Sequence, residues 1–150
     1  MPTPTPTPIP TPMRLAPTGL DLLDRARESL LTALTTSTAG ERYVAAHLAA
    51  LRTAAAVLAV RGRPTRRGRP RSVWEVLPAV APELGEWATF FDAGAARRAA
   101  VEAGRNEVVS TREADDLLRD AERFLLIVES ALGLPRQDVL PAGGLLPLSG

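Results

Sequence analysis

The sequence predicts an all-α fold, a four-main-helix bundle in which the third helix is split. Two observations support it. Stretches with apolar residues at every third or fourth position follow one another along the chain, which is the period of helices packed on one side. Each stretch is preceded by a Ser or Thr with an Asp or Glu three residues later, at Thr18/Asp21, Thr38/Glu41, Ser72/Glu75 and Ser110/Glu113.

These four pairs predict where the helices begin. The hydroxyl of the first residue can accept a hydrogen bond from a backbone N–H that has no partner inside the helix. The acid three residues later can bond back to the cap and also lies at the positive end of the helix dipole. No stretch of the sequence predicts a β-strand.

The first two predicted helices span about residues 19–36 and 39–60. On the first, the leucines near one stripe are Leu20, Leu23, Leu30 and Leu34. On the second, the apolar residues with the 4-3-4-3 spacing of packed helices are Val44, Leu48, Leu51, Ala55 and Leu58. Further alanines raise the helix propensity of the second stretch and permit close approach of its neighbours.

The third helix is predicted in two parts, a short one in "SVWEVLPAV" and a longer one that begins at Pro82, since proline is favoured as a first helical residue. The shared face of the longer part is Leu84, Trp87, Phe91 and Ala95. The fourth helix begins at "TREADD" and ends at Gly133, with its seam at Leu117, Ala121, Phe124, Val128 and Ala131. Short connections favour an up-and-down bundle.

One helical domain is therefore expected over residues 18–133. Residues 1–17, which open with "MPTPTPTPIPTP", predict a disordered Pro/Thr tail, because proline fixes φ and lacks an N–H. Residues 134–150 are interrupted by prolines and glycines and predict a flexible C-terminal tail.

The chain has no cysteine, so disulfides and thiolate metal sites are excluded. By hydropathy pattern we expect no membrane-spanning segment, which takes an apolar stretch of ~20 residues, and no secretory signal. We expect a soluble cytoplasmic protein without a membrane partner. The absence of a glycine-rich phosphate loop and of a Ser-His-Asp constellation predicts no cofactor.

All 18 basic residues are arginine, and six of them lie in "RGRPTRRGRPR", residues 61–71. The rest of the chain carries 12 arginines against 17 acidic residues, so an acidic body displays one basic loop. The repeated RGRP resembles the AT-hook, in which an extended Arg-Gly-Arg segment lies in the narrow minor groove. The alternative is an exposed connector with no partner.

RNA or DNA is accordingly the expected ligand of this loop. The arginines predicted to contact phosphates are Arg61, Arg63, Arg66, Arg67, Arg69 and Arg71, together with Arg97 and Arg98 after the aromatic run of the third helix. Four aromatic residues could serve as base-stacking platforms but are expected mainly in the core: Trp74, Trp87, Phe90 and Phe91.

Arg42 and the single histidine, His47, form an Arg-x4-His spacing. A neutral imidazole can take a proton from a ribose 2′-OH while a guanidinium steadies a phosphate oxyanion. Five positions of a straight helix turn by roughly 140°, so the two side chains diverge unless the helix bends or a second subunit supplies one of them. The alternative is a histidine packed in the core.

The acidic residues of the last helix predict a solvated face rather than a cation site, because no histidine or second acidic helix completes the coordination. They are Asp115, Asp116, Asp120 and Glu122. No metal is predicted.

Three segments, "ERYVAAHLAALRTAAAVLA", "RPRSVWEVLPAVAPELGEWATFFDAGAARRAAVEAG" and "STREADDLLRDAERFLLIVESALG", resemble the small actinobacterial branch of the HEPN superfamily (higher eukaryotes and prokaryotes nucleotide-binding domains). The resemblance covers about residues 18–133. It implies a helical bundle that often dimerises. In many members it also implies metal-independent RNA cleavage by an Arg-x4–6-His motif near the start of the last main helix, a helix that has no histidine here.

The sequence therefore predicts a HEPN-like binding or regulatory module, non-catalytic, that contacts nucleic acid, a nucleotide or a protein partner, with a homodimer as the expected assembly. One alternative is a metal-independent HEPN ribonuclease that uses Arg42 and His47 across a dimer. A second alternative is a structural protein-interaction domain.

Overall fold

The computed structural model describes residues 18–62 and 71–134, and within these two ranges every regular element is a helix, which confirms the all-α prediction. The elements are α1 (Gly19–Thr35), α2 (Ala39–Arg61), α3 (Val73–Val80), α4 (Gly85–Glu102) and α5 (Thr111–Ala131), with 3-10 turns at Pro82–Leu84 and Asn106–Val108. The predicted tails, residues 1–17 and 134–150, lie outside the described residues except for Leu134, as do residues 63–70.

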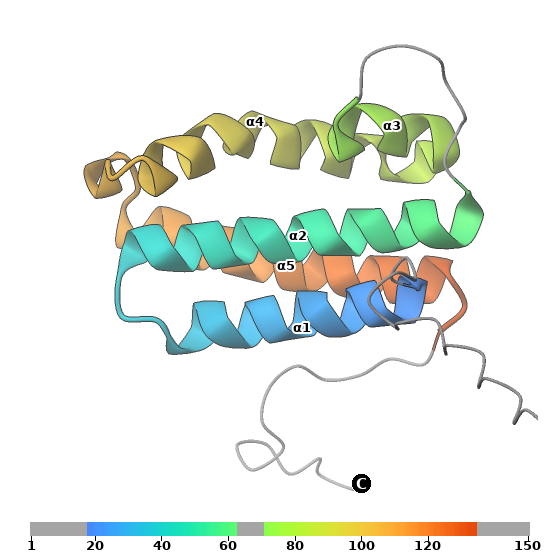
Figure 1. Cartoon of the computed structure of the whole chain (residues 1–150), viewed down its shortest axis with the longest axis horizontal. Coiled ribbons are helices and arrows are strands. Elements are labelled where there is room, and N and C mark those ends of the chain that lie inside the picture. The colour runs from blue at the N-terminus through green and yellow to red at the C-terminus, as the bar shows by residue number, and fades with distance from the viewer. Residues whose placement is uncertain (1–17, 63–70, 135–150) are drawn as a thin grey trace, which may run out of the picture.

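The bundle is built around α2, which contacts α1, α3, α4 and α5 (Figure 1). In this view α1 lies on one side of α2, and α3 and α4 lie on the other, with α5 behind. Helix α4 lies mainly on α2 and α3, whereas α5 lies mainly on α2 and α1. This arrangement leaves α4 and α5 as neighbours with little direct packing between their backbones.

The four predicted helix starts are all capped by the expected hydroxyl, which accepts from the backbone N–H three residues later. The hydroxyls belong to Thr18, Thr38, Ser72 and Ser110. The acid returns the bond only at α1 and α5, where the capping box is complete. At α2 the acid binds elsewhere, since the carboxylate of Glu41 accepts a hydrogen bond from the Thr36 hydroxyl at 2.7 Å.

The core differs from the predicted stripes mainly on α2. Four of the predicted seam residues of α2, Val44, Leu48, Leu51 and Ala55, are only half-buried. The fully buried faces are instead formed largely by its alanines, because a helix with neighbours on several sides needs small residues at each contact. Two further core predictions were wrong: Leu20 is 60% exposed, and Ala131 is exposed at the end of α5.

The split third helix was predicted correctly, but its longer part does not begin at Pro82. Pro82–Leu84 forms a 3-10 turn, and α4 begins at Gly85. The aromatic residues nearby belong to the core, as expected for most of them. The ring of Phe91 is completely buried, with its centroid 5.3 Å from that of Trp74 and 5.1 Å from that of Phe124. Phe90 is the exception, at 45% exposed.

Helix α2 corrects one sequence-based statement. By length and composition it is long and apolar enough to cross a membrane, with a mean hydropathy of 1.6 over its most apolar window. Of that window 61% is buried inside the protein, so the same residues also have the character of a bundle's core helix.

Candidate functional site

Arg42, one of the two predicted catalytic residues, lies on α2 and makes hydrogen bonds to the end of α1 and to α5. Its Nε donates to the carbonyl of Ala33 at 3.0 Å and its Nη2 to the carbonyl of Thr36 at 2.8 Å. These carbonyls lie at the C-terminal end of α1, where no helical N–H remains to bond them. Its Nη1 donates to Asp115 of α5 at 2.7 Å. Each guanidinium nitrogen of Arg42 thus has an intramolecular partner.

His47, the second predicted catalytic residue, is completely buried on α2. Its Nε2 lies 2.8 Å from the carbonyl oxygen of Phe91, an acceptor only, so Nε2 carries the proton and donates. Its Nδ1, 3.2 Å from Nη1 of Arg98, therefore accepts. Burial lowers the pKa of the imidazole below its usual value, the bond to Phe91 opposes this, and the positive Arg98 adds to it. These contacts favour a neutral imidazole with its proton on Nε2.

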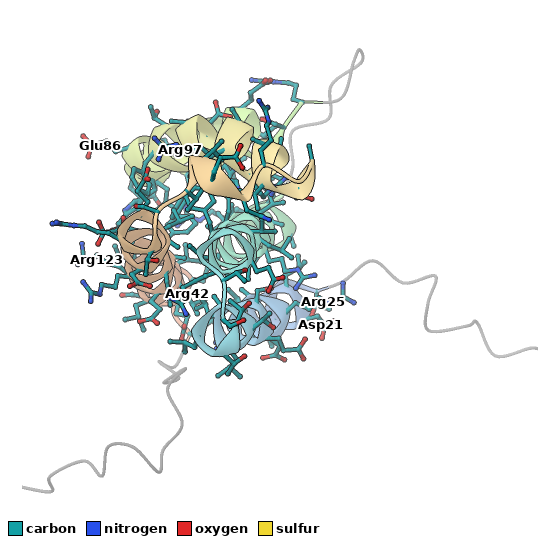
Figure 2. All side chains as sticks on the ribbon, turned by 90° about the vertical axis from the view of Figure 1, so that its left-hand side faces the viewer. Asp21, Arg25, Arg42, Glu86, Arg97 and Arg123 are labelled. Carbon is teal, nitrogen blue, oxygen red and sulfur yellow. The ribbon has the colours of Figure 1, made fainter. Side chains whose placement is uncertain are left out.

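Within one chain, Arg42 and His47 are not brought together. Arg42 faces α1 and α5, whereas His47 faces α4, as the turn between positions five apart in a helix requires. Figure 2, a view along the bundle, shows Arg42 near α1 and α5 and Arg97 beside α4.

The two consecutive arginines of α4 have different partners. Arg98 donates to His47 and lies with Nε 3.0 Å from Oε1 of Glu102, one turn further along α4. Arg97 extends to α5 and pairs with Glu113, the residue that also completes the α5 capping box. Both predicted phosphate ligands are thus engaged by acids of the same chain.

The ends of the arginine-rich segment are also paired. Arg61, at the last turn of α2, pairs with Glu83, and Arg71, before α3, lies 3.6 Å from the carboxylate of Glu75. The other predicted nucleic-acid ligands of this segment, Arg63, Arg66, Arg67 and Arg69, lie outside the described residues.

Sequence reasoning missed a hollow of about 470 Å³ between α4 and α5. Tyr43 of α2 lines it together with residues of both helices, among them Phe90, Gly94, Arg97, Glu113, Asp116 and Asp120. The signal in the sequence was Gly94, a glycine inside a helix. A Cβ built on it would lie 2.8 Å from the Tyr43 hydroxyl oxygen, so the glycine allows that hydroxyl to approach the backbone of α4 closely.

Two residues that line the hollow, Asp120 and Tyr43, have pKa values above their ordinary values. Burial raises the pKa of Asp120, which the adjacent Asp116 raises further, while Arg123 opposes it. Burial also raises the pKa of Tyr43, with Arg97 acting against it and Glu113 with it. In the described parts of the chain no three His, Asp or Glu side chains are grouped so that they could hold a metal ion.

Comparisons with known proteins gave one match. The model of the family HEPN_SAV_6107, described as an HEPN-like domain, matches residues 33–129. This stretch extends from the last turn of α1 almost to the end of α5, and contains the buried imidazole and the hollow. A search of curated proteins and a search of solved structures found no match.

Proposed function

The chain belongs to the HEPN_SAV_6107 family of HEPN-like domains, and from this membership we propose that it is a non-catalytic module that binds nucleic acid. The observation that carries the first half of the proposal is the burial of His47. A general base must come within about 3 Å of the proton it removes. His47 is completely buried and both ring nitrogens already have partners in the chain, so a substrate hydroxyl has no place beside it.

Arg42 supports the same conclusion. A guanidinium that stabilises a phosphate oxyanion must offer its N–H groups to the substrate. Three of the five N–H groups of Arg42, one on each nitrogen, are used by two backbone carbonyls and Asp115, which gives this residue a structural role at the junction of α1, α2 and α5.

The nucleic-acid half of the proposal rests on residues 61–71. The arginines at the two ends are paired with Glu83 and Glu75, so we assign phosphate contact to the four arginines between them, Arg63, Arg66, Arg67 and Arg69. The body that carries this segment is acidic, which disfavours phosphate elsewhere on its surface.

The test is the salt dependence of binding to duplex DNA. Four phosphate contacts give a log–log slope of about −3.6, because each releases counterions worth about −0.9. The double substitution Arg67→Gln/Arg69→Gln is expected to reduce the magnitude of the slope by about two contacts, or about 1.8. The matched control, Arg25→Gln/Arg112→Gln, removes two exposed arginines from α1 and α5 and is expected to keep the slope.

Two results would contradict the proposal. If neither DNA nor RNA binds at low salt, the segment is a connector and the protein-interaction alternative stands. If the wild type cleaves RNA without metal and His47→Ala loses that cleavage while remaining folded, the ribonuclease alternative stands. A preference for A·T-rich duplex would identify the RGRP repeats as minor-groove ligands.

A further inference from the structure

We propose that the hollow between α4 and α5 binds a guanidinium group, with Asp116 and Asp120 as its anionic ligands and the Tyr43 hydroxyl as a neutral one. This site is separate from the arginine-rich segment. Tyr43 lies in the first turns of α2 and Arg61 at its last residue, about 27 Å apart along the axis at 1.5 Å per residue.

The hollow is held open by side chains at both ends. At one end, α4 and α5 are joined by aromatic contacts, with the ring centroid of Phe124 5.1 Å from Phe91 and 5.4 Å from Trp87. At the other end they are joined by the ion pair of Arg97 with Glu113. The space between, about 470 Å³, is within the usual size range of small-molecule sites.

Tyr43 gives the hollow a polar group that belongs to a helix other than that of the two carboxylates. Its side chain is 5% exposed and lines the hollow, yet its hydroxyl makes no hydrogen bond to any residue in the ranges 18–62 and 71–134. Although most of the residue is buried, the hydroxyl oxygen itself is open to the hollow and available to an occupant. The hydroxyl oxygen can accept an N–H, and it lies against the backbone of Gly94, where a Cβ would meet it at 2.8 Å.

The charge of the hollow favours a cation. Glu113 is already paired with Arg97. The other two carboxylates that line the hollow, those of Asp116 and Asp120, are one turn apart on the same face of α5. The cation nearest Asp120 is Arg123, whose side chain is 67% exposed and 3.9 Å away, so it neutralises that carboxylate weakly. A cation inside the hollow would therefore relieve the repulsion between the partly buried Asp120 and the exposed Asp116.

The shape of the site favours guanidinium over ammonium. A guanidinium is planar and presents five N–H donors in a fixed fork, enough for two carboxylates and a hydroxyl at once. It also stacks on aromatic rings, and the exposed ring of Phe90 lines the hollow. An ammonium offers three donors from a single point and has no face to stack.

The guanidinium could come from a small molecule or from an arginine side chain of a peptide. The experiment measures, on the full chain, dissociation constants for four probes by NMR titration: n-butylguanidinium, n-butylammonium, and the capped peptides acetyl-Gly-Arg-Gly-amide and acetyl-Gly-Lys-Gly-amide. We expect both guanidinium probes to bind more tightly than their ammonium counterparts. A peptide that binds more tightly than butylguanidinium indicates a peptide ligand, and the reverse indicates a small molecule.

Variants locate the site. Asp116→Asn and Asp120→Asn are each expected to weaken butylguanidinium binding about tenfold, the worth of one charge-assisted hydrogen bond. Tyr43→Phe removes only the hydroxyl and is expected to weaken binding severalfold. The control Glu122→Gln removes a carboxylate from α5 outside the hollow and is expected to leave binding unchanged.

The proposal is overturned if no probe binds the wild type at about 10 mM, a concentration at which even a very weak site fills. It is also overturned if butylammonium binds as tightly as butylguanidinium, or if Glu122→Gln weakens binding as much as Asp120→Asn. Because Asp116 is exposed, its substitution leaves the fold intact, and circular dichroism checks this for each variant.

Discussion

The imidazole of His47 makes the stability of the protein depend on pH. Burial holds its pKa below the ordinary value of 6.5, so on acidification the unfolded chain takes up the proton before the folded chain does. The contribution of His47 to stability is therefore complete above pH 6.5 and is lost as the pH falls below it. Each unit by which folding depresses the pKa is worth about 1.4 kcal/mol.

The measurement is the free energy of urea unfolding at pH 7 and pH 5 for the wild type and for His47→Gln. The chain has one histidine, so the variant removes its only imidazole, while the carboxylates titrate equally in both proteins. We expect the variant to be less stable at pH 7 and to lose less stability on acidification. An identical loss in both proteins would mean that folding does not shift the pKa of the imidazole.

Arg42 gives a second prediction at this scale. Arg42→Ala removes two hydrogen bonds to carbonyls at the end of α1 and the pair with Asp115, so we expect the free energy of unfolding to fall by about 2 kcal/mol. Arg42→Lys is expected to recover part of this, because an ammonium cannot satisfy three acceptors in different directions. Unchanged stability in Arg42→Ala would contradict the structural role of Arg42.

The sequence identified Arg42 and His47 as notable but not what they contact. Their divergence followed from helical geometry alone. The partners did not, because Ala33, Asp115 and Phe91 come from other helices, and the sequence does not show how those helices are placed around α2. The hollow was missed for the same reason, since its floor comes from α2 and its walls from α4 and α5.

Among the helices, the start of α5 carries the clearest prediction. Ser110 and Glu113 form a complete capping box, with both bonds at 3.1 Å. We expect Ser110→Ala to destabilise the protein by about 1 kcal/mol in thermal or urea unfolding. Ser130→Ala, an exposed serine at the other end of the same helix, is the control and is expected to have little effect. Equal effects of the two would show that the cap contributes nothing beyond a generic serine loss.

Helix starts were the most predictable feature of the chain, because a cap depends only on residues within one turn. The faces of α2 were the least predictable. A 4-3-4-3 stripe of larger apolar residues normally marks the buried side of a helix, yet here Val44, Leu48 and Leu51 are half-buried. The reason is that α2 has four helical neighbours, which alanine-sized residues accommodate at close range.

For the molecule as a whole, this half-buried stripe is where we expect a second copy to bind. Leu48 and Leu51 are apolar and partly open to solvent on the central helix. We expect light scattering to report a dimer, and Leu48→Arg to convert it to a monomer by placing a charge in the interface. Leu31→Arg, at a 40% exposed leucine of α1, is the control and should leave the mass unchanged. A monomer at every accessible concentration would contradict the expectation.

The central place of α2 also orders the helices by how readily each can separate from the rest. To open α2, the protein must break its packing on four helices, whereas α4 rests on α2 and α3 and reaches α5 through a few side chains. Elements with fewer buried contacts open at lower free energy. The walls of the hollow are therefore unequal: α5 is firmly seated and α4 is the yielding one, so an occupant could be admitted by a small outward movement of α4 while the bundle beneath it stays folded.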